Sequence, residues 1–240
     1  MKRYLLSILF LLAIAFNGFT QDIHLAQTNM TPLLINPANA GSEYTMRGIL
    51  NYRNQWSSIG NPYRTYAVML DGGILKNKWK NGYLCVGLNA FKDVAGATKF
   101  GTTKISLALS SVIYLDDKNT ASVGLMGSWA QNSMNPDNLR WDSQFNGQSF
   151  SATAPTFENF TYNSINYFDF SAGALWAYGS GAKTLSSQDG FNTQAGIAFY
   201  HVTQPNQQLK FGAKDKLYSK WSFHSESNIG LANSKFALRP

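Results

Sequence analysis

Side chains that could carry out catalysis are few in this sequence and far apart. His24, His201 and His224 lie in three separate segments, and none has a serine and an aspartate at a spacing typical of a catalytic triad. Cys85 is the only cysteine, so neither an internal disulfide nor a Cys/His metal site is expected. We therefore predict a protein that is not an enzyme, with no catalytic residue, no metal and no cofactor.

Two groups of residues could bind a partner protein instead. Asn36 and Pro37 precede the first predicted strand, and the proline restricts Asn36 to extended geometry. This pair forms either a plug or docking turn that contacts a partner, or a simple turn that starts the strand. Trp141, Phe145 and Phe150 make a long connection rich in aromatic residues, and they either contact a partner or pack on the protein itself. These five residues are the predicted partner-binding site.

The basic residues do not form a pattern typical of nucleic-acid binding. The chain has a net charge of +7, yet its lysines and arginines are scattered apart from a short cluster at residues 76–80. Arg47 and Arg53 share the polar face of the first predicted strand and could bind acidic groups in a lumen. A salt bridge to an interior acid, such as Asp71 or Asp169, is the interpretation that we prefer. No nucleic-acid partner is predicted.

The N-terminus has the layout of a secretory signal peptide. Lys2 and Arg3 precede an apolar run over residues 4–16, which small and polar residues follow. This run is shorter than the roughly 20 residues of a membrane-spanning helix, so we predict cleavage near Thr20. The predicted organisation is a signal peptide at residues 1–20 and one exported domain at residues 21–240.

Alternation of apolar and polar residues dominates the rest of the chain. Ile105, Leu107 and Leu109 share one face of the clearest predicted strand, and Ser106 and Ser110 share the other. Eight segments follow this pattern, at residues 46–56, 64–71, 84–90, 105–115, 121–129, 168–178, 191–202 and 217–228. Most exceed the roughly 5 to 6 residues of an average soluble strand and suit a tilted crossing of a bilayer. The sequence therefore predicts an all-β fold, an antiparallel transmembrane β-barrel.

The polar face and the connections refine this prediction. The polar face is rich in glycine, serine and alanine, as expected for strands that surround a filled or narrow interior. Residues 116–119 read as a tight turn and residues 131–166 as a long loop, so loop length alternates between the two ends of the barrel. The loops at residues 57–62, 93–99, 132–166 and 204–216 are predicted to face outward. The connections at residues 72–82 and 179–190 are predicted to face the periplasm.

Several sequence elements together resemble a known family. The start of the predicted mature chain at residues 21–27, the element Asn-Pro-Ala-Asn-Ala-Gly at residues 36–41 and the element Asn-Tyr-Arg-Asn-Gln-Trp at residues 51–56 follow the order and spacing of the PorP/SprF family. The match continues through residues 65–66, residues 87–88, Asp93, His201 and residues 204–206, which is nearly the whole mature chain. The chain thus resembles outer-membrane proteins of Bacteroidetes that are associated with type IX secretion and gliding motility.

The resemblance implies a function and a location. It implies a non-enzymatic outer-membrane component of the type IX machinery that supports export or surface attachment of partner proteins. Its partners would be type IX components, a large surface adhesin and outer-membrane lipid. Barrels of the family have on the order of fourteen strands, an ordinary size for this membrane, so eight strands indicate either a truncated sequence or a shortened family member.

Two other functions stay open at this point. A passive outer-membrane channel or transporter for small solutes would have a continuous polar lumen. A soluble secreted β-sandwich adhesin would need no detergent, but the strand lengths argue against it.

Overall fold

The computed structural model describes residues 30–58, 60–74, 76, 78–96, 98–135, 140–157, 164–179, 191–207, 215–230 and 237–238. The predicted signal peptide lies outside these residues, as does His24. The division of the chain into a signal peptide and one exported domain therefore stays a prediction.

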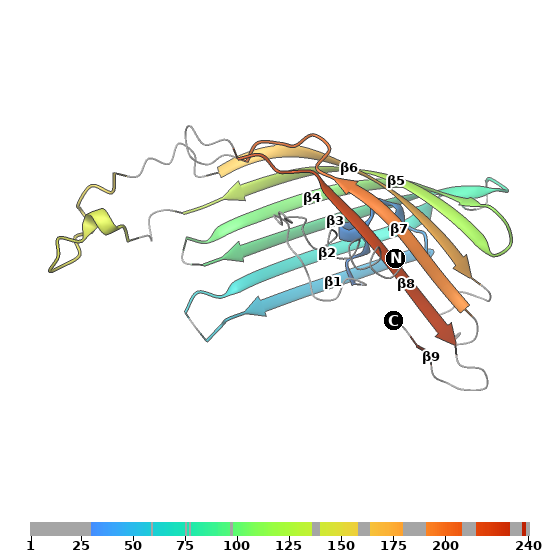
Figure 1. Ribbon diagram of the computed structural model, residues 1–240, viewed down its shortest axis with the longest axis horizontal. Coiled ribbons are helices and arrows are strands. Elements are labelled where there is room, and N and C mark those ends of the chain that lie inside the picture. Colours follow the sequence, from blue (N-terminus) through green and yellow to red (C-terminus); the bar gives the residue numbers. More distant parts are fainter. Residues whose placement is uncertain are drawn as a thin grey trace, which may run out of the picture.

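One antiparallel sheet contains every described strand, and neighbours in the sheet are neighbours in the chain. Its strands are β1 (Met46–Gln55), β2 (Tyr63–Ile74), β3 (Gly82–Ala95), β4 (Phe100–Tyr114), β5 (Asn119–Ser133), β6 (Ser164–Gly179), β7 (Phe191–Tyr200), β8 (Lys220–Gly230) and β9 (Ala237–Leu238). The long strands lie side by side and the sheet curls into a half-barrel (Figure 1). The all-β prediction and the eight predicted strands are confirmed; the short β9 was not predicted.

Some predicted boundaries differ from those of the structure. The prediction ran to residue 202 for the seventh strand, whereas β7 ends at Tyr200. The chain turns at His201, which has a φ of 58°, a left-handed value that a strand cannot contain. The eighth strand starts at Lys220 and not at Leu217, because Leu217 and Pro205 already pair through their backbones within the preceding connection.

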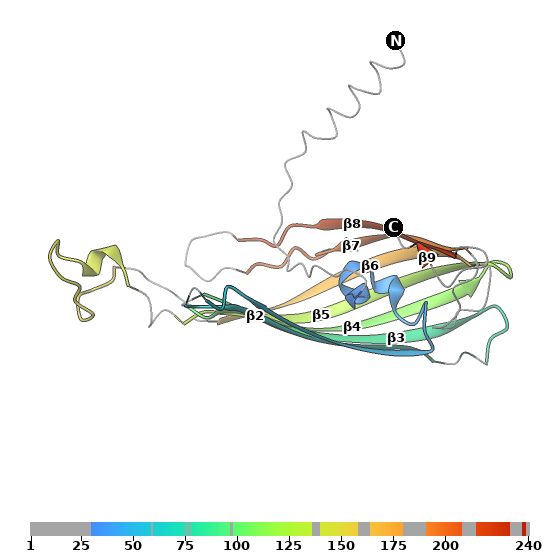
Figure 2. The same ribbon diagram turned by 90° about the horizontal axis from the view of Figure 1, so that it is seen from below.

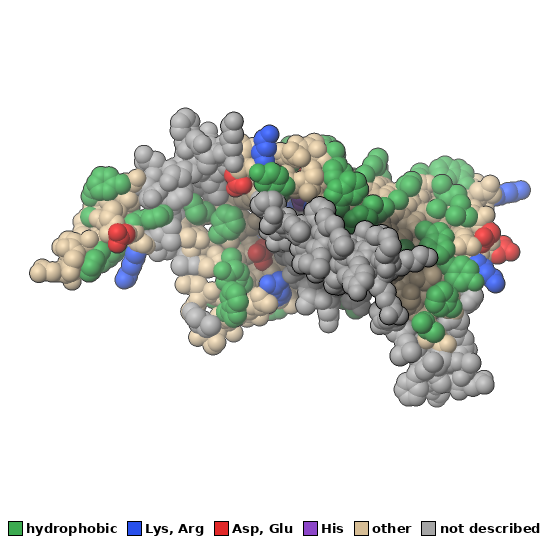
Figure 3. Space-filling view, viewed as in Figure 1, with side chains coloured by type: hydrophobic (Ala, Val, Ile, Leu, Met, Phe, Trp, Pro, Cys, Tyr) green, Lys and Arg blue, Asp and Glu red, His purple; other side chains and the backbone are tan. Residues whose placement is uncertain are grey.

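The two faces of the sheet differ in the way the alternation predicts. On β4, Leu107 and Leu109 are exposed, whereas Ser106, Ala108 and Ser110 are buried. Apolar residues are exposed on other strands too, where Leu50, Leu125 and Phe168 have exposed fractions of 80%, 69% and 68%. An apolar outer face over a small and polar inner face is typical of strands that cross a lipid bilayer. Figure 3 shows hydrophobic side chains gathered over β7 and β8.

The helices of the described residues are short. Of those residues, none belongs to a helix that is long and apolar enough to span a membrane.

The strand ends place the connections alternately at two ends of the sheet, as predicted. At one end, Asp116 closes the turn between β4 and β5: its Oδ1 accepts hydrogen bonds from the amides of Lys118 at 2.8 Å and Asn119 at 2.7 Å. These bonds stabilise the carboxylate and lower the pKa of Asp116. At the other end lies the long connection between β5 and β6. Which end faces outward stays a prediction.

The buried core lies on the concave face of the sheet, beneath the residues that precede β1. Leu33 and Ala40 from this segment pack with Met69, Ala108 and Met126 from the sheet. Figure 2 shows the segment, in blue, between the strands β3 to β5 and the strands β7 and β8. The chain therefore fills its own concave face.

Candidate functional site

The candidate site is the concave face together with residues 31–41, which we call the plug segment. This segment contains α2 (Pro32–Ile35) and the 3-10 helix η2 (Pro37–Asn39). Each helix begins with proline, whose fixed φ suits the first helical position. Asn36 ends α2 and starts η2, since its backbone amide donates to Pro32 O at 3.0 Å and its Oδ1 accepts from the amide of Ala38 at 2.9 Å. Local sequence alone thus favours a compact double turn.

The plug segment crosses the strands of the sheet, and a side chain from each of several strands binds its backbone. The donors and acceptors are Tyr200 Oη to Leu33 O at 3.3 Å, Ser122 Oγ to Ala38 O at 2.8 Å, Ser110 Oγ to Ala40 O at 2.7 Å, Tyr83 Oη to Gly41 O at 3.1 Å, and Gly41 N to Asp71 Oδ2 at 2.8 Å. These side chains come from β7, β5, β4, β3 and β2. Buried backbone groups of the plug segment are therefore satisfied by the wall of the sheet.

Glycines on the inner face give the plug segment its room. A Cβ on Gly124 would lie 2.6 Å from the amide nitrogen of Ala38, and one on Gly173 would lie 2.0 Å from Oδ1 of Asn36. Gly87 in the same way makes room for Leu33, at 2.8 Å from its Cδ1. Such distances are too short for a real Cβ contact, so a side chain at any of these positions would force a neighbour to move. At Gly124 the blocking atoms belong to the backbone of the plug segment, so no side-chain rotation could relieve the overlap.

The side chain of Asn36 binds two strands of the sheet. Its side-chain nitrogen donates to the carbonyls of Ala174 at 2.9 Å and Ile197 at 3.2 Å, one on β6 and one on β7. The residue is fully buried, and Pro37 is among the largest fully buried side chains. Both residues contact their own sheet, so the structure places these predicted partner-binding residues in an internal contact.

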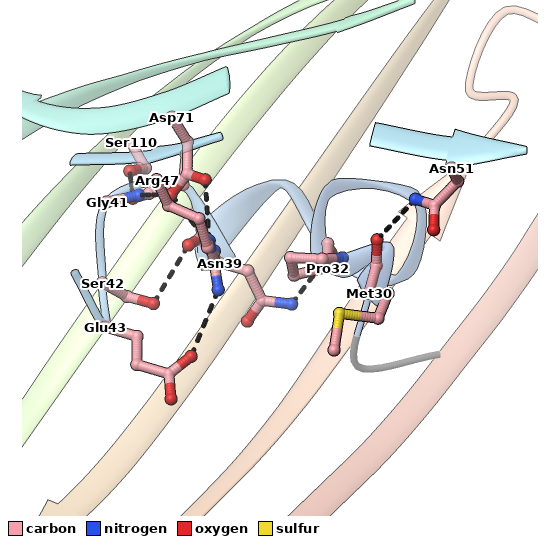
Figure 4. Close-up of polar contacts among 11 residues, drawn as sticks. Met30, Pro32, Asn39, Gly41, Ser42, Glu43, Arg47, Asn51, Asp71 and Ser110 are labelled. Carbon is pink, nitrogen blue, oxygen red and sulfur yellow. Dashed lines mark hydrogen bonds and ion pairs between the residues drawn. The ribbon is translucent and has the colours of Figure 1, made fainter. Parts of the chain in front are cut away.

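A buried ion pair anchors the C-terminal end of the plug segment. Arg47 Nε lies 2.9 Å from Asp71 Oδ1, Arg47 Nη1 lies 3.2 Å from Glu43, and Asp71 also accepts the amide of Gly41 (Figure 4). The preferred salt bridge of Arg47 to an interior acid is therefore confirmed. Arg53 donates to Gln55 Oε1 at 2.5 Å.

A second polar cluster lies between the plug segment and the end of the sheet with the long loop. Asp169 Oδ2 is 2.8 Å from His201 Nδ1 and 3.5 Å from Lys104 Nζ, and Asp169 is fully buried. His201 starts the connection between β7 and β8, and its carbonyl accepts from Ser219 Oγ at 3.4 Å. The cluster thus fixes this connection to β4 and β6. Within the described part of the chain, no three His, Cys, Asp or Glu side chains form a group that could hold a metal ion.

The aromatic loop residues are not brought together with Asn36 and Pro37. They lie in a small unit at residues 140–157, beyond the strand ends in Figures 1 and 2. Trp141 precedes the 3-10 helix η4 (Asp142–Gln144), Phe145 pairs with Phe150 through their backbones, and Arg140 stacks on the ring of Phe150. Phe145 keeps 54% of its surface exposed. Contacts within the unit therefore stabilise its conformation, and the ring of Phe145 remains accessible on its surface.

Sequence reasoning missed the side chains that hold the plug segment. Ser110, Ser122, Tyr83 and Tyr200 sit at ordinary inner-face positions, and nothing in their local sequence marks them. The signal that could have found them is the excess of glycine and serine on the polar face, which predicted a filled interior without naming what fills it.

The comparisons with known proteins identify the family. No curated protein and no solved structure matches this chain. The family model of the type IX secretion system membrane protein PorP/SprF matches residues 17–240, which include every element described above. The resemblance seen in the sequence is confirmed, and the chain belongs to the PorP/SprF family of type IX secretion system membrane proteins.

Proposed function

We propose that this chain is an outer-membrane component of the type IX machinery that binds and positions partner proteins during export or surface attachment, without catalysis. The observation that carries the proposal is the combination of an apolar outer face with a concave face that the chain occupies itself. An occupied interior favours a scaffold over an open solute channel, because the plug segment and the ion pairs take the place of a continuous polar lumen.

The partner contacts are proposed at the end of the sheet that carries the long connection between β5 and β6. Phe145 and Phe157 of the loop unit have exposed fractions of 54% and 80%, and exposed aromatic rings are frequent anchors of protein interfaces. Trp141 and Phe150 would support this surface from within the same unit. For Asn36 and Pro37 we propose a different role, which is to hold the plug segment in place.

The test is a pull-down from detergent-solubilised outer membranes, with a tag in the connection between β3 and β4 at residues 96–99 and mass spectrometry of what is recovered. Recovery of type IX proteins, with a large adhesin among them, supports the proposal. Recovery of the barrel alone, with solute conductance in planar bilayers, favours the channel. Absence from the outer-membrane fraction contradicts the proposed location.

A matched pair of variants locates the contact. Phe145→Ala with Phe157→Ala should reduce recovery of the partner at least about tenfold, the effect of losing a single interface anchor. Phe191→Ala, a half-exposed aromatic residue at the opposite end of the sheet, should leave recovery unchanged. Equal recovery with both variants contradicts a partner site on the loop unit.

A further inference from the structure

The plug segment lies on the sheet as a ligand lies in a groove. The plug segment closes its own turns with backbone hydrogen bonds, such as that from Ala40 N to Pro37 O at 3.2 Å, and it is not one of the described strands of the sheet. Its contacts to the wall run instead between its backbone and the side chains of Asp71, Ser110 and Ser122. Side chains of this kind can bind the backbone of a peptide that is not itself a strand of the sheet.

The groove selects a narrow class of peptide. Residues 31–41 contain no charged side chain. Gly124 of β5 and Gly173 of β6 lie beneath Asn36 and Pro37, where the seated segment leaves no space for a Cβ on the wall. The two hydrogen bonds from the Asn36 side chain to the carbonyls of Ala174 and Ile197 require a donor at this one position. The structure therefore specifies an uncharged segment with an Asn-Pro turn, an apolar side chain before the turn at Leu33 and small residues after it.

We propose that the concave face is a peptide-binding groove that the chain keeps occupied with its own plug segment, and that an uncharged Asn-Pro segment of a partner polypeptide takes the same place when the plug segment leaves. The inference rests on the proposed function only for the source of the competing segment. The groove and the exchange belong to the chain itself and can be measured on purified protein.

The linkage of the plug segment to β1 sets how hard it is to displace. Residues 42–45 join Gly41 to β1, so the plug segment competes at an effective concentration on the order of millimolar. A free peptide of equal affinity must reach that concentration to displace it.

Cys85 supplies a native reporter of displacement. It is the only cysteine of the chain, it is 1% exposed, and it lies under the plug segment, where a Cβ on Gly41 would be 2.7 Å from its Sγ. A water-soluble maleimide should therefore label Cys85 only while the plug segment is away from the groove. The full chain, folded in detergent micelles, is sufficient for this measurement.

The experiment compares two serines of the same strand. Ser122→Ala removes the hydrogen bond to Ala38 O, and Ser128→Ala removes a bond to Ser106 Oγ that involves no plug residue. Loss of one buried bond should raise the labelling rate of Ser122→Ala about tenfold or more over wild type, whereas Ser128→Ala should label like wild type. Adding a synthetic peptide of residues 30–42 should slow the labelling of Ser122→Ala, and the same peptide with Asn36→Ala should not.

Three outcomes overturn the proposal. Wild-type labelling rates in Ser122→Ala would mean that the plug segment is a permanent part of the fold. Equal acceleration in both variants would mean that the sheet itself opens, and an unchanged rate at millimolar peptide would mean that the groove does not exchange its occupant. If Ser122→Ala does not fold by circular dichroism, Asn36→Ala replaces it. None of these results changes the recovery of type IX proteins, so the two proposals fail separately.

Discussion

Replacing Gly124 by alanine tests whether the plug segment rests on β5. The added Cβ would lie 2.6 Å from the amide nitrogen of Ala38 and 2.6 Å from the carbonyl carbon of Pro37. Both atoms belong to the backbone, so no side-chain rotation can relieve the overlap. We expect the plug segment to shift away from the strand, which also strains the hydrogen bond from Ser122 to Ala38 O.

The size of the effect follows from the geometry and from a control on the same strand. Forcing one extra carbon into a packed site costs about 1 to 3 kcal/mol, which is roughly a 5- to 150-fold change in an equilibrium constant. Gly127→Ala adds the same carbon to the outer face, where the nearest atom, on the ring of Phe170, is an ordinary 3.6 Å away. Both variants gain the same small stabilisation, about 0.4 to 1 kcal/mol, from a less flexible unfolded chain. That gain cancels in the comparison.

The assay is urea unfolding in detergent micelles, combined with maleimide labelling of Cys85. Gly124→Ala should unfold at lower urea than Gly127→Ala and should label faster before unfolding, because the plug segment no longer seats. Equal unfolding midpoints together with equal labelling rates would refute the contact between the plug segment and β5. Lower stability without faster labelling would mean that the overlap is relieved within the sheet and that the plug segment stays seated.

Three further predictions concern the anchor, the outer face and the turn. Asp71→Asn breaks the buried ion pair with Arg47 and should lower the free energy of unfolding by about 3 to 5 kcal/mol. Glu43→Gln, at the more exposed end of the network, should change this free energy little. Equal urea midpoints for the two variants would contradict the anchor. Leu125→Lys places a charge in the middle of β5 on the outer face, and it should make the free energy of folding into lipid vesicles about 2 to 4 kcal/mol less favourable. Leu125→Ala is the control. Unimpaired insertion of Leu125→Lys would show that this face does not meet lipid. The lowered pKa of Asp116 means that its carboxylate stabilises the turn above the unfolded pKa, and that this contribution is lost as the pH falls through the folded pKa. A carboxyl titration by NMR should give a lower midpoint in the folded chain than in a free peptide of residues 113–121. Equal midpoints would disprove the turn contacts.

Much of the fold follows from local sequence. Period-two alternation is written into each strand, so the outward direction of Leu107 and the inward direction of Ser106 could be predicted without knowing any neighbour. The turn at Asp116 could also be predicted, because its contacts span only three residues. The end of β7 could not, because His201 leaves the strand to meet Asp169, a residue 32 positions away.

The candidate site divides in the same way. The sequence by itself predicted a turn at Asn36 and Pro37 before the first strand, and it predicted that Arg47 pairs with an interior acid. It also determined that the polar face of the strands is built from small residues. Only the tertiary structure decided that the turn lies on the concave face and that Ser122 meets Ala38 across 84 positions of the chain. It also decided that Asp169 binds Lys104 and His201. Alternation fixes the face to which each side chain points, whereas the partner that it meets there depends on strand register and on the path of the plug segment. Both are set by packing between residues distant in sequence, which no local pattern encodes.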